Sequence, residues 1–262
     1  MPDFQTAAGV NIYYEVHGEG IPLIFIHPPL AGHVIFKYQF DLSRKYKVIF
    51  YDCRGHGKSG YLPSAHPEDV ISDHVQDLKA LIDHLKIEHP VITGYSNGGL
   101  IALAYALAFP DAIGALVLSG GYPKVDTWLL KQEYNSGIFL MKKKKLRFLS
   151  YLIAKTHKVT RSDQQQFYSY GLKANRKAVL DLYVAGKIYN AASQLHKLRN
   201  LPILVLYGTK DIHVYQHKKY FETLPNAKII FIKKAFHQLP THWYPMFNWE
   251  LIQFIEEKAS LS

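Results

Sequence analysis

The sequence predicts an α/β fold of three layers, in which helices cover both faces of a mostly parallel β-sheet and a further helical segment is inserted late in the chain. Three observations support this. Short apolar runs alternate with longer stretches whose apolar residues recur at helical spacing. Several of the short runs are apolar on both faces, as in the middle of a parallel sheet. The stretch 122–197 is rich in lysine and contains no clear strand.

The strands and helices follow in a regular order. Strands are expected at 10–16, 22–27, 47–52, 90–94, 113–118, 202–207 and 228–232. Helices are expected at 70–85, 100–109, 215–224 and 246–257. Right-handed crossovers between parallel strands bring the carboxyl ends of the strands to one edge, and we therefore expect the active site there.

The insertion divides the chain into a core, 1–121 and 198–262, and a helical cap, 122–197. A segment of this length is too long for a simple loop, so we expect it to form a lid over the carboxyl edge of the sheet. We expect most of its aromatic side chains to pack between cap and core and about a third to line a substrate pocket. These are Trp128, Phe139, Phe148, Tyr151, Phe167, Tyr168, Tyr170, Tyr183 and Tyr189.

Composition limits the class of protein. The 262 residues are 48% hydrophobic, which is enough for one large core. There is no N-terminal apolar signal and no run of ~18 apolar residues, so we expect a cytoplasmic protein that does not span a membrane. Cys53 is the single cysteine, which excludes an internal disulfide. The net charge of +10 could indicate a polyanionic partner. However, no nucleic-acid motif is present, and the lysine run 142–145 is typical of a solvated helix face. Oligomeric state is not indicated.

The stretch Gly94-Tyr95-Ser96-Asn97-Gly98 has the pattern G-x-S-x-G between a predicted strand and a predicted helix. Such a serine stands exposed at a sharp strand-to-helix turn, where bulk at either glycine would collide with neighbouring backbone. The following helix directs its unpaired amide groups toward whatever reacts there. Ser96 is therefore the candidate nucleophile.

A carboxylate and an imidazole follow two later strands. Asp211 comes after the strand at 202–207, and His237 comes after the strand at 228–232. A serine hydroxyl needs an imidazole to take its proton, and the imidazole needs a carboxylate to hold its tautomer. His242 is the rival base, and Glu222 and Asp163 are the rival acids. We favour His237 and Asp211 because each follows a strand end closely.

Together these motifs resemble those of capped α/β-hydrolase-fold proteins, and the likeness runs from about residue 9 to about residue 257. The loop after the second predicted strand, His27-Pro28-Pro29-Leu30-Ala31-Gly32, is similar to the family's His-Gly-x-x-Gly. The segment Asp52-Cys53-Arg54-Gly55-His56-Gly57-Lys58-Ser59 matches Asp-x-Arg-Gly-x-Gly-x-Ser. The resemblance is specific for the fold, but one such fold hosts many reactions.

The resemblance implies a serine hydrolase that acts on an acyl ester through an acyl-enzyme, without a cofactor or a metal. Similar proteins that remove halide or open epoxides use an aspartate where this chain has Ser96. Two alternatives stay open: hydrolysis of a carbon–carbon bond in a vinylogous diketone, and a slow ligand-sensing protein that signals through a partner. We expect the small-molecule substrate to contact His27, Tyr95, Tyr122 and Trp128.

The oxyanion hole is where this chain departs from the family. One donor should be the Asn97 backbone N–H, and the family's second donor falls on Pro29, which has no N–H. The loop could shift so that the Leu30 N–H serves, another side chain could take over, or the hole could be weakened. Losing one donor costs ~2.7–4 kcal/mol of transition-state stabilisation. We rank the shift to Leu30 first.

Overall fold

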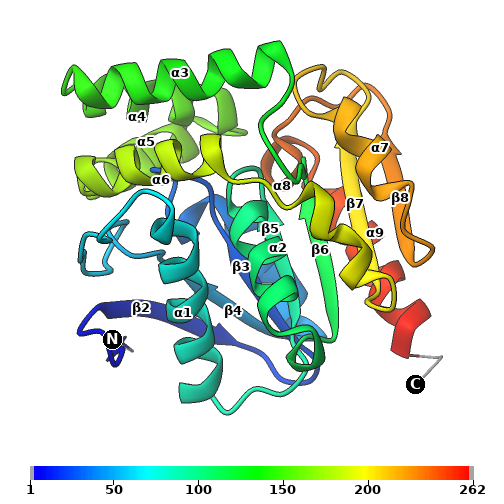
Figure 1. Ribbon diagram of the computed structural model, residues 1–262. Helices are drawn as coiled ribbons and strands as arrows, with labels where there is room; N and C mark the ends of the chain where they lie inside the picture. The colour runs from blue at the N-terminus through cyan, green and yellow to red at the C-terminus, as the bar shows by residue number, and fades with distance from the viewer. Residues whose placement is uncertain (1–2, 260–262) are drawn as a thin grey trace.

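The computed structural model describes residues 3–259, and in this part of the chain the strands form one eight-stranded sheet (Figure 1). The strands are β1 (Asp3–Gln5), β2 (Asn11–His17), β3 (Pro22–Ile26), β4 (Lys47–Tyr51), β5 (Val91–Tyr95), β6 (Ala115–Ser119), β7 (Ile203–Gly208) and β8 (Ala227–Ile232). Their order across the sheet is β1-β2-β4-β3-β5-β6-β7-β8. β2 pairs antiparallel with both β1 and β4, and the other neighbouring strands pair parallel, so the sheet is mostly parallel, as predicted.

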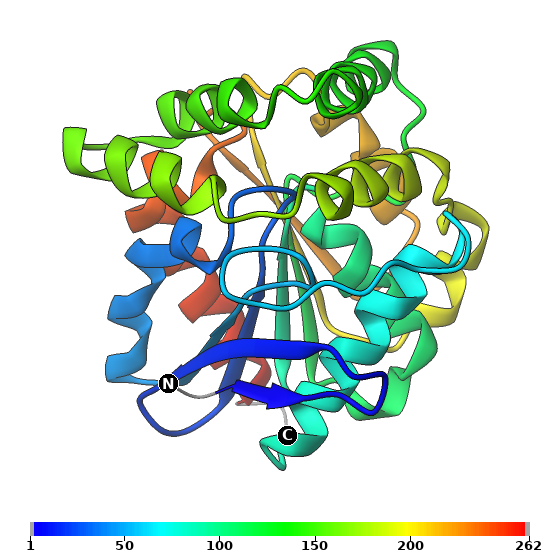
Figure 2. The same ribbon diagram turned by 90° about the vertical axis from the view of Figure 1, so that its left-hand side faces the viewer.

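Helices cover both faces of this sheet, as Figure 2 shows. Helices α1 (Asp69–His84) and α2 (Gly98–Ala108) lie on one face, and the 3₁₀-helical segment η1 (His33–Arg44) and α9 (Tyr244–Ala259) lie on the other. The predicted three-layer α/β fold is confirmed.

The alternation of side chains along β3 explains why two helical layers are needed. Leu23 and Phe25 belong to the apolar cluster that includes α9, whereas Ile24 and Ile26 belong to the cluster that includes α1 and α2. All four side chains are fully buried. Because a strand turns successive side chains to opposite faces, a strand that is apolar at every position must be covered on both sides.

Several connections differ from the sequence prediction. β1 and η1 were not predicted, because β1 has three residues and the apolar residues Val34, Ile35 and Phe36 are consecutive rather than at helical spacing. The helix expected at 215–224 is instead η4 (Tyr215–His217) followed by α7 (Lys218–Phe221), and a short α8 (Leu239–His242) precedes α9. The short 3₁₀ turns η2 (Pro110–Ala112) and η3 (Ala192–Leu198) complete the elements.

Four helices lie between β6 and β7 and cover the carboxyl edge of the sheet (Figure 1). They are α3 (Trp128–Lys142), α4 (Leu146–His157), α5 (Arg161–Gly171) and α6 (Arg176–Ile188). We refer to residues 122–197 as the helical insertion. Thr160 begins α5 with a capping box that includes Asp163, and the Asn175 side chain caps α6. Within residues 3–259, no helix has the length and apolar character needed to cross a bilayer.

Candidate active site

Ser96 occupies the turn between β5 and α2 and has a φ of 54°, in the left-handed region. A non-glycine residue held there costs of order 1–3 kcal/mol and needs surrounding structure to keep it in place. The backbone of neighbouring elements packs closely against this turn. A Cβ on Gly98 would lie 2.4 Å from the Ile26 carbonyl oxygen, and one on Gly94 would lie 2.5 Å from the backbone of α2. The Ser96 N–H donates to the Ser119 carbonyl at 2.8 Å. Ser96 lines a cavity at this edge.

Asp211 and His237 are brought together at the same edge. His237 Nδ1 lies 2.6 Å from Asp211 Oδ2, and Asp211 is buried. Burial opposes protonation of His237, but the Asp211 carboxylate outweighs it and raises the pKa of the imidazole to about 9. His237 Nε2 is buried and has no hydrogen-bond partner within the described chain. The structure therefore leaves this nitrogen free at the cavity that Ser96 lines.

Gly120 makes room for this imidazole, and sequence reasoning missed it. Its φ is 61°, and a Cβ at this position would lie 2.5 Å from His237 Cε1. The signal in the sequence was a glycine pair directly after a predicted strand, at 120–121.

The rival base and acids lie elsewhere. His242 Nε2 is 2.9 Å from the Lys158 carbonyl oxygen and does not line the cavity. Asp163 belongs to the capping box of α5 and accepts from Lys37 Nζ at 2.7 Å. Glu222 pairs with Lys218 on the surface of α7. None of the three hydrogen-bonds to His237.

The loop that follows β3 forms a turn around Pro29. The Ala31 N–H donates to the Pro28 carbonyl at 3.3 Å, and Leu30 has a φ of 74°. This pattern matches a type II turn with proline at its first central position, which leaves the Leu30 N–H outside the turn's own hydrogen bond. Within residues 3–259, neither the Leu30 N–H nor the Asn97 N–H donates to a protein acceptor. Leu30 and Asn97 are both almost fully buried.

His27 holds this loop rather than facing the cavity. Its Nδ1 donates to the Pro28 carbonyl at 2.8 Å, and its Nε2 accepts from the Cys53 N–H at 2.9 Å. Burial lowers the pKa of the imidazole to about 3, so His27 is neutral. It is fully buried and does not line the cavity. The structure thus places His27 outside the cavity lining, whereas we expected it to contact the substrate.

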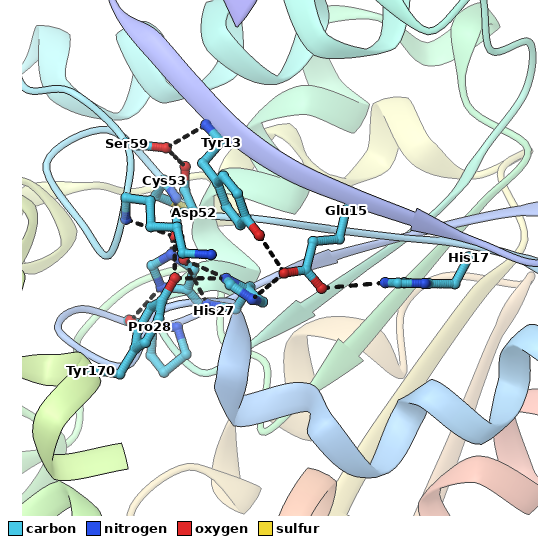
Figure 3. A network of polar contacts seen from close by, with 11 residues as sticks. Tyr13, Glu15, His17, His27, Pro28, Asp52, Cys53, Ser59 and Tyr170 are labelled. Carbon is cyan, nitrogen blue, oxygen red and sulfur yellow. Dashed lines mark hydrogen bonds and ion pairs between the residues drawn. The ribbon is translucent and has the colours of Figure 1, made fainter. Parts of the chain in front are cut away.

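Asp52 is the first residue of the segment 52–59, which resembles the family's Asp-x-Arg-Gly-x-Gly-x-Ser. It forms the centre of the polar network in Figure 3. This buried carboxylate accepts from the His33 N–H and Nδ1, the Lys58 N–H and the Tyr170 hydroxyl, at 2.7–2.9 Å. Burial disfavours its charge, but His33 outweighs burial and lowers its pKa to about 2. Tyr170 belongs to α5, so the network joins the helical insertion to the core.

The cavity beside Ser96 has a volume of about 570 Å³, and residues of α3 and α4 line it. Of the expected substrate contacts, Tyr95, Tyr122 and Trp128 line it. Pro28 and Pro29 also line it, and Leu30 does not. Other lining residues come from the helical insertion and were not predicted from the sequence. Their helical spacing does not show whether a side chain faces the cavity or the core. They are Leu129, Gln132, Glu133, Tyr134, Ser136, Gly137, Leu140, Leu149, Leu152, Ile153, Thr156 and His157.

A chain of hydroxyl groups crosses the cavity wall toward Ser96. Asn97 Nδ2 donates to the Tyr134 hydroxyl at 2.7 Å, and the Tyr134 and Tyr122 hydroxyls are 2.7 Å apart. Burial raises the pKa of Tyr122 well above its ordinary value, while its interaction with the Ser96 side chain lowers it slightly. Tyr122 is therefore a neutral hydroxyl beside Ser96.

His157 from α4 also reaches this wall. Its Nδ1 donates to the Ile153 carbonyl at 2.9 Å, so its Nε2 accepts from the Tyr95 hydroxyl at 2.9 Å. Burial lowers the pKa of His157 to about 3. In the part of the chain that the structure describes, no group of three or more His, Cys, Asp or Glu residues could hold a metal ion.

Comparison with known proteins decides the family. A family model described as "alpha/beta hydrolase fold" matches residues 21–240, which is most of the chain. The chain belongs to the alpha/beta hydrolase family. This alpha/beta hydrolase is 28% identical over 222 residues to the "AB hydrolase superfamily protein YisY" of Bacillus subtilis, covering 79% of this chain and 80% of that protein.

Two further comparisons involve proteins named as esterases. The alpha/beta hydrolase is 26% identical over 273 residues to the "Bifunctional esterase/perhydrolase DCH" of Acinetobacter calcoaceticus, with 95% and 98% of the two chains covered. Its structure matches that of an esterase from Exiguobacterium antarcticum with a TM-score of 0.86 and 22% identity, covering 97% and 98%. The structural match at this identity shows the fold alone. The comparisons support an enzyme that catalyses ester or related hydrolysis.

Proposed function

We propose that this alpha/beta hydrolase cleaves a small or medium uncharged ester through an acyl-Ser96 intermediate. The observation that carries the proposal is the His237–Asp211 pair, whose unpartnered Nε2 shares a cavity with Ser96. A hydroxyl, an imidazole and an orienting carboxylate are the groups needed to activate a serine.

The reaction proceeds in two halves. Ser96 Oγ attacks the ester carbonyl carbon as its proton passes to His237 Nε2, and a tetrahedral intermediate forms. The bond to the alcohol oxygen breaks, and that oxygen takes the proton from His237. Water then gives its proton to His237 and attacks the acyl carbon, so that the carboxylic acid leaves and Ser96 regains its proton.

The Asn97 and Leu30 N–H groups are proposed to hold the oxyanion. Both are buried and free of protein acceptors in the described chain, so a substrate oxygen would satisfy donors that are otherwise costly to leave unpaired. The type II turn explains how a loop with Pro29 can still supply a donor. The helical insertion is proposed to act as the lid that excludes water from this site.

The cavity supports an uncharged substrate. Its volume of about 570 Å³ suits a small molecule. Its lining includes no lysine or arginine within residues 3–259, and the one lining carboxylate is Glu133. An anionic substrate would meet no lysine or arginine there, and pairing with protonated His237 would hold the base in its inactive form.

The test is a fluorophosphonate probe together with a chromogenic short-chain ester. We expect the wild-type protein to be labelled at Ser96 and to hydrolyse the ester. Ser96→Ala should abolish labelling and lower kcat by roughly 10⁶. Ser136→Ala is the matched control, since Ser136 is another hydroxyl that lines the cavity. Labelling of the Ser96→Ala protein would move the nucleophile elsewhere, and labelling without ester turnover would contradict the ester substrate.

A further inference from the structure

The net positive charge of this chain comes from the helical insertion. Residues 122–197 contain fifteen lysines and arginines against four aspartates and glutamates. The rest of the chain contains sixteen against seventeen and is close to neutral. The net charge of +10 therefore belongs to the segment that covers the candidate active site.

Few of these cations are neutralised by carboxylates. Among the insertion's described lysines and arginines, Lys124 and Lys177 alone lie within 4.0 Å of a carboxylate oxygen. The run 142–145 is exposed. Lys142 ends α3 and residues 143–145 form the turn before α4, so the run is not the helix face that we expected from the sequence. Unpaired cations gathered on one surface produce a positive potential that attracts polyanions.

Exposed aromatic side chains lie among these cations. Most aromatic side chains of the insertion pack in the apolar clusters, in line with our expectation, whereas Trp128, Phe139, Phe148 and Tyr151 are 70%, 58%, 51% and 43% exposed. Trp128 and Phe139 are about three turns apart and so share one side of α3. Phe148 and Tyr151 lie on the first turns of α4. Large exposed apolar groups gathered on one surface mark an interaction site.

The cavity opens on this same surface. Its walls include residues from both α3 and α4, and its lining residues Trp128, Gln132, Ser136 and Thr156 are exposed. These two helices form the outer edge of the molecule above the sheet (Figures 1 and 2). A partner bound to the aromatic and basic surface would therefore face the cavity.

We propose that the surface of α3, the 142–145 turn and α4 docks on an anionic lipid bilayer. Lysines would bind the headgroups while the aromatic side chains enter the interfacial region, which is the combination that interfacial helices use. Charge complementarity alone would also suit nucleic acid, but the exposed tryptophan and phenylalanines favour a lipid surface. Bound in this way, the protein would take apolar esters from the bilayer directly into the cavity. This last step depends on the proposed function, whereas docking does not.

The experiment measures binding of the full chain to sedimented vesicles of phosphatidylcholine, with and without about 30 mol% phosphatidylglycerol. We expect binding to the anionic vesicles, weakened strongly as NaCl rises from about 0.05 M to about 0.5 M. Replacing Lys142, Lys143, Lys144 and Lys145 by glutamine should weaken binding by about tenfold or more. The matched control replaces the exposed lysines Lys86, Lys219, Lys233 and Lys234 by glutamine, which should leave binding within about twofold.

A second variant tests the aromatic side chains. Phe139→Ser with Phe148→Ser keeps every charge, and we expect it to lose the binding that persists at high salt. Circular dichroism should show that both variants remain folded. The proposal would be overturned if the control lysine variant lost vesicle binding to the same extent as the variant of the 142–145 run. It would also be overturned if the protein bound single-stranded DNA more tightly than the anionic vesicles. Because vesicle binding needs no turnover, an inactive Ser96→Ala protein should bind as the wild type does.

Discussion

Asn97 Nδ2 donates a hydrogen bond to the Tyr134 hydroxyl at 2.7 Å, which ties the residue after Ser96 to helix α3. The contact is tight, because a Cβ on Gly186 of α6 would lie 2.4 Å from the same nitrogen. Since Tyr134 accepts from Asn97, its own proton is free to go to Tyr122, 2.7 Å away. The Tyr122 hydroxyl also interacts with the Ser96 side chain. The helical insertion thus contributes to the polar surroundings of Ser96 and does not merely cover it.

Replacing Tyr122 by phenylalanine tests whether the Tyr122 hydroxyl contributes to the reaction at Ser96. Tyr122→Phe should lower kcat about tenfold to a hundredfold, because a hydroxyl beside the reacting atoms is lost while the ring stays. Tyr183→Phe is the control, since Tyr183 also lines the cavity. Steady-state kinetics with a chromogenic ester measures both. An unchanged kcat for Tyr122→Phe would mean that its hydroxyl only supports Tyr134.

Replacing Pro29 by glycine tests the proposed donor at Leu30. If the Leu30 N–H already holds the oxyanion, Pro29→Gly should leave ester hydrolysis unchanged or lower it by loosening the turn. The turn carries Leu30 at a φ of 74°, so its rigidity matters. A rise in kcat of more than about tenfold, some 1.4 kcal/mol, would instead show that the wild-type hole lacks a donor.

Two alanine variants distinguish the candidate bases. His237→Ala should lose ester hydrolysis nearly as completely as Ser96→Ala, because the imidazole and the serine act as one unit. His242→Ala should keep activity within about tenfold, since His242 binds a carbonyl of the insertion away from the cavity. The comparison uses kcat with the same ester. The reverse ranking would exclude the His237 assignment.

The pH dependence of kcat/KM should report on His237. The imidazole must be neutral to accept the Ser96 proton, and Asp211 raises its pKa above 6.5, to about 9. Activity should therefore rise with pH through the alkaline range until the imidazole is deprotonated. Asp211→Asn should move this rise to lower pH and reduce the maximal kcat by about 10⁴. A pH profile that is identical in the two proteins would show that Asp211 does not act on His237.

His33 should make the stability of the fold depend on pH. It lies between Asp52, at 2.9 Å, and Glu15, at 3.3 Å, and these partners outweigh burial and raise its pKa from 6.5 to about 9. Protonated His33 stabilises the folded state. This contribution is complete below about pH 6.5, the pKa of histidine in the unfolded chain, and it is lost as the pH rises through about 9. We expect His33→Gln to lower the free energy of unfolding by about 3 kcal/mol near pH 6.

Urea denaturation at about pH 6 and about pH 10 measures this difference. The difference in free energy of unfolding between the wild type and His33→Gln should be smaller at the higher pH. His66→Gln, at an exposed histidine, should change the free energy of unfolding little at either pH. A difference that stays constant would show that the charge of His33 contributes nothing.

The local pattern of the sequence was enough to predict the layers of the fold and the turns that carry Ser96, Asp211 and His237. Apolar strands must be covered on both faces, and parallel strands deliver the residues after them to one edge. The candidate pair His237–Asp211 was therefore predictable from two strand ends. The role of these residues in a reaction stays a prediction.

Tertiary structure alone decided what surrounds those residues. His27 follows a buried strand as His237 does, yet it binds the Pro28 carbonyl and the Cys53 N–H, because β4 pairs with β3 and brings Cys53 beside it. Tyr134 and His157 are spaced like core residues of their helices, and only packing of α3 and α4 over the sheet turns them toward the cavity. Helical periodicity shows that a side chain faces inward, but it does not show whether it meets another side chain or a cavity.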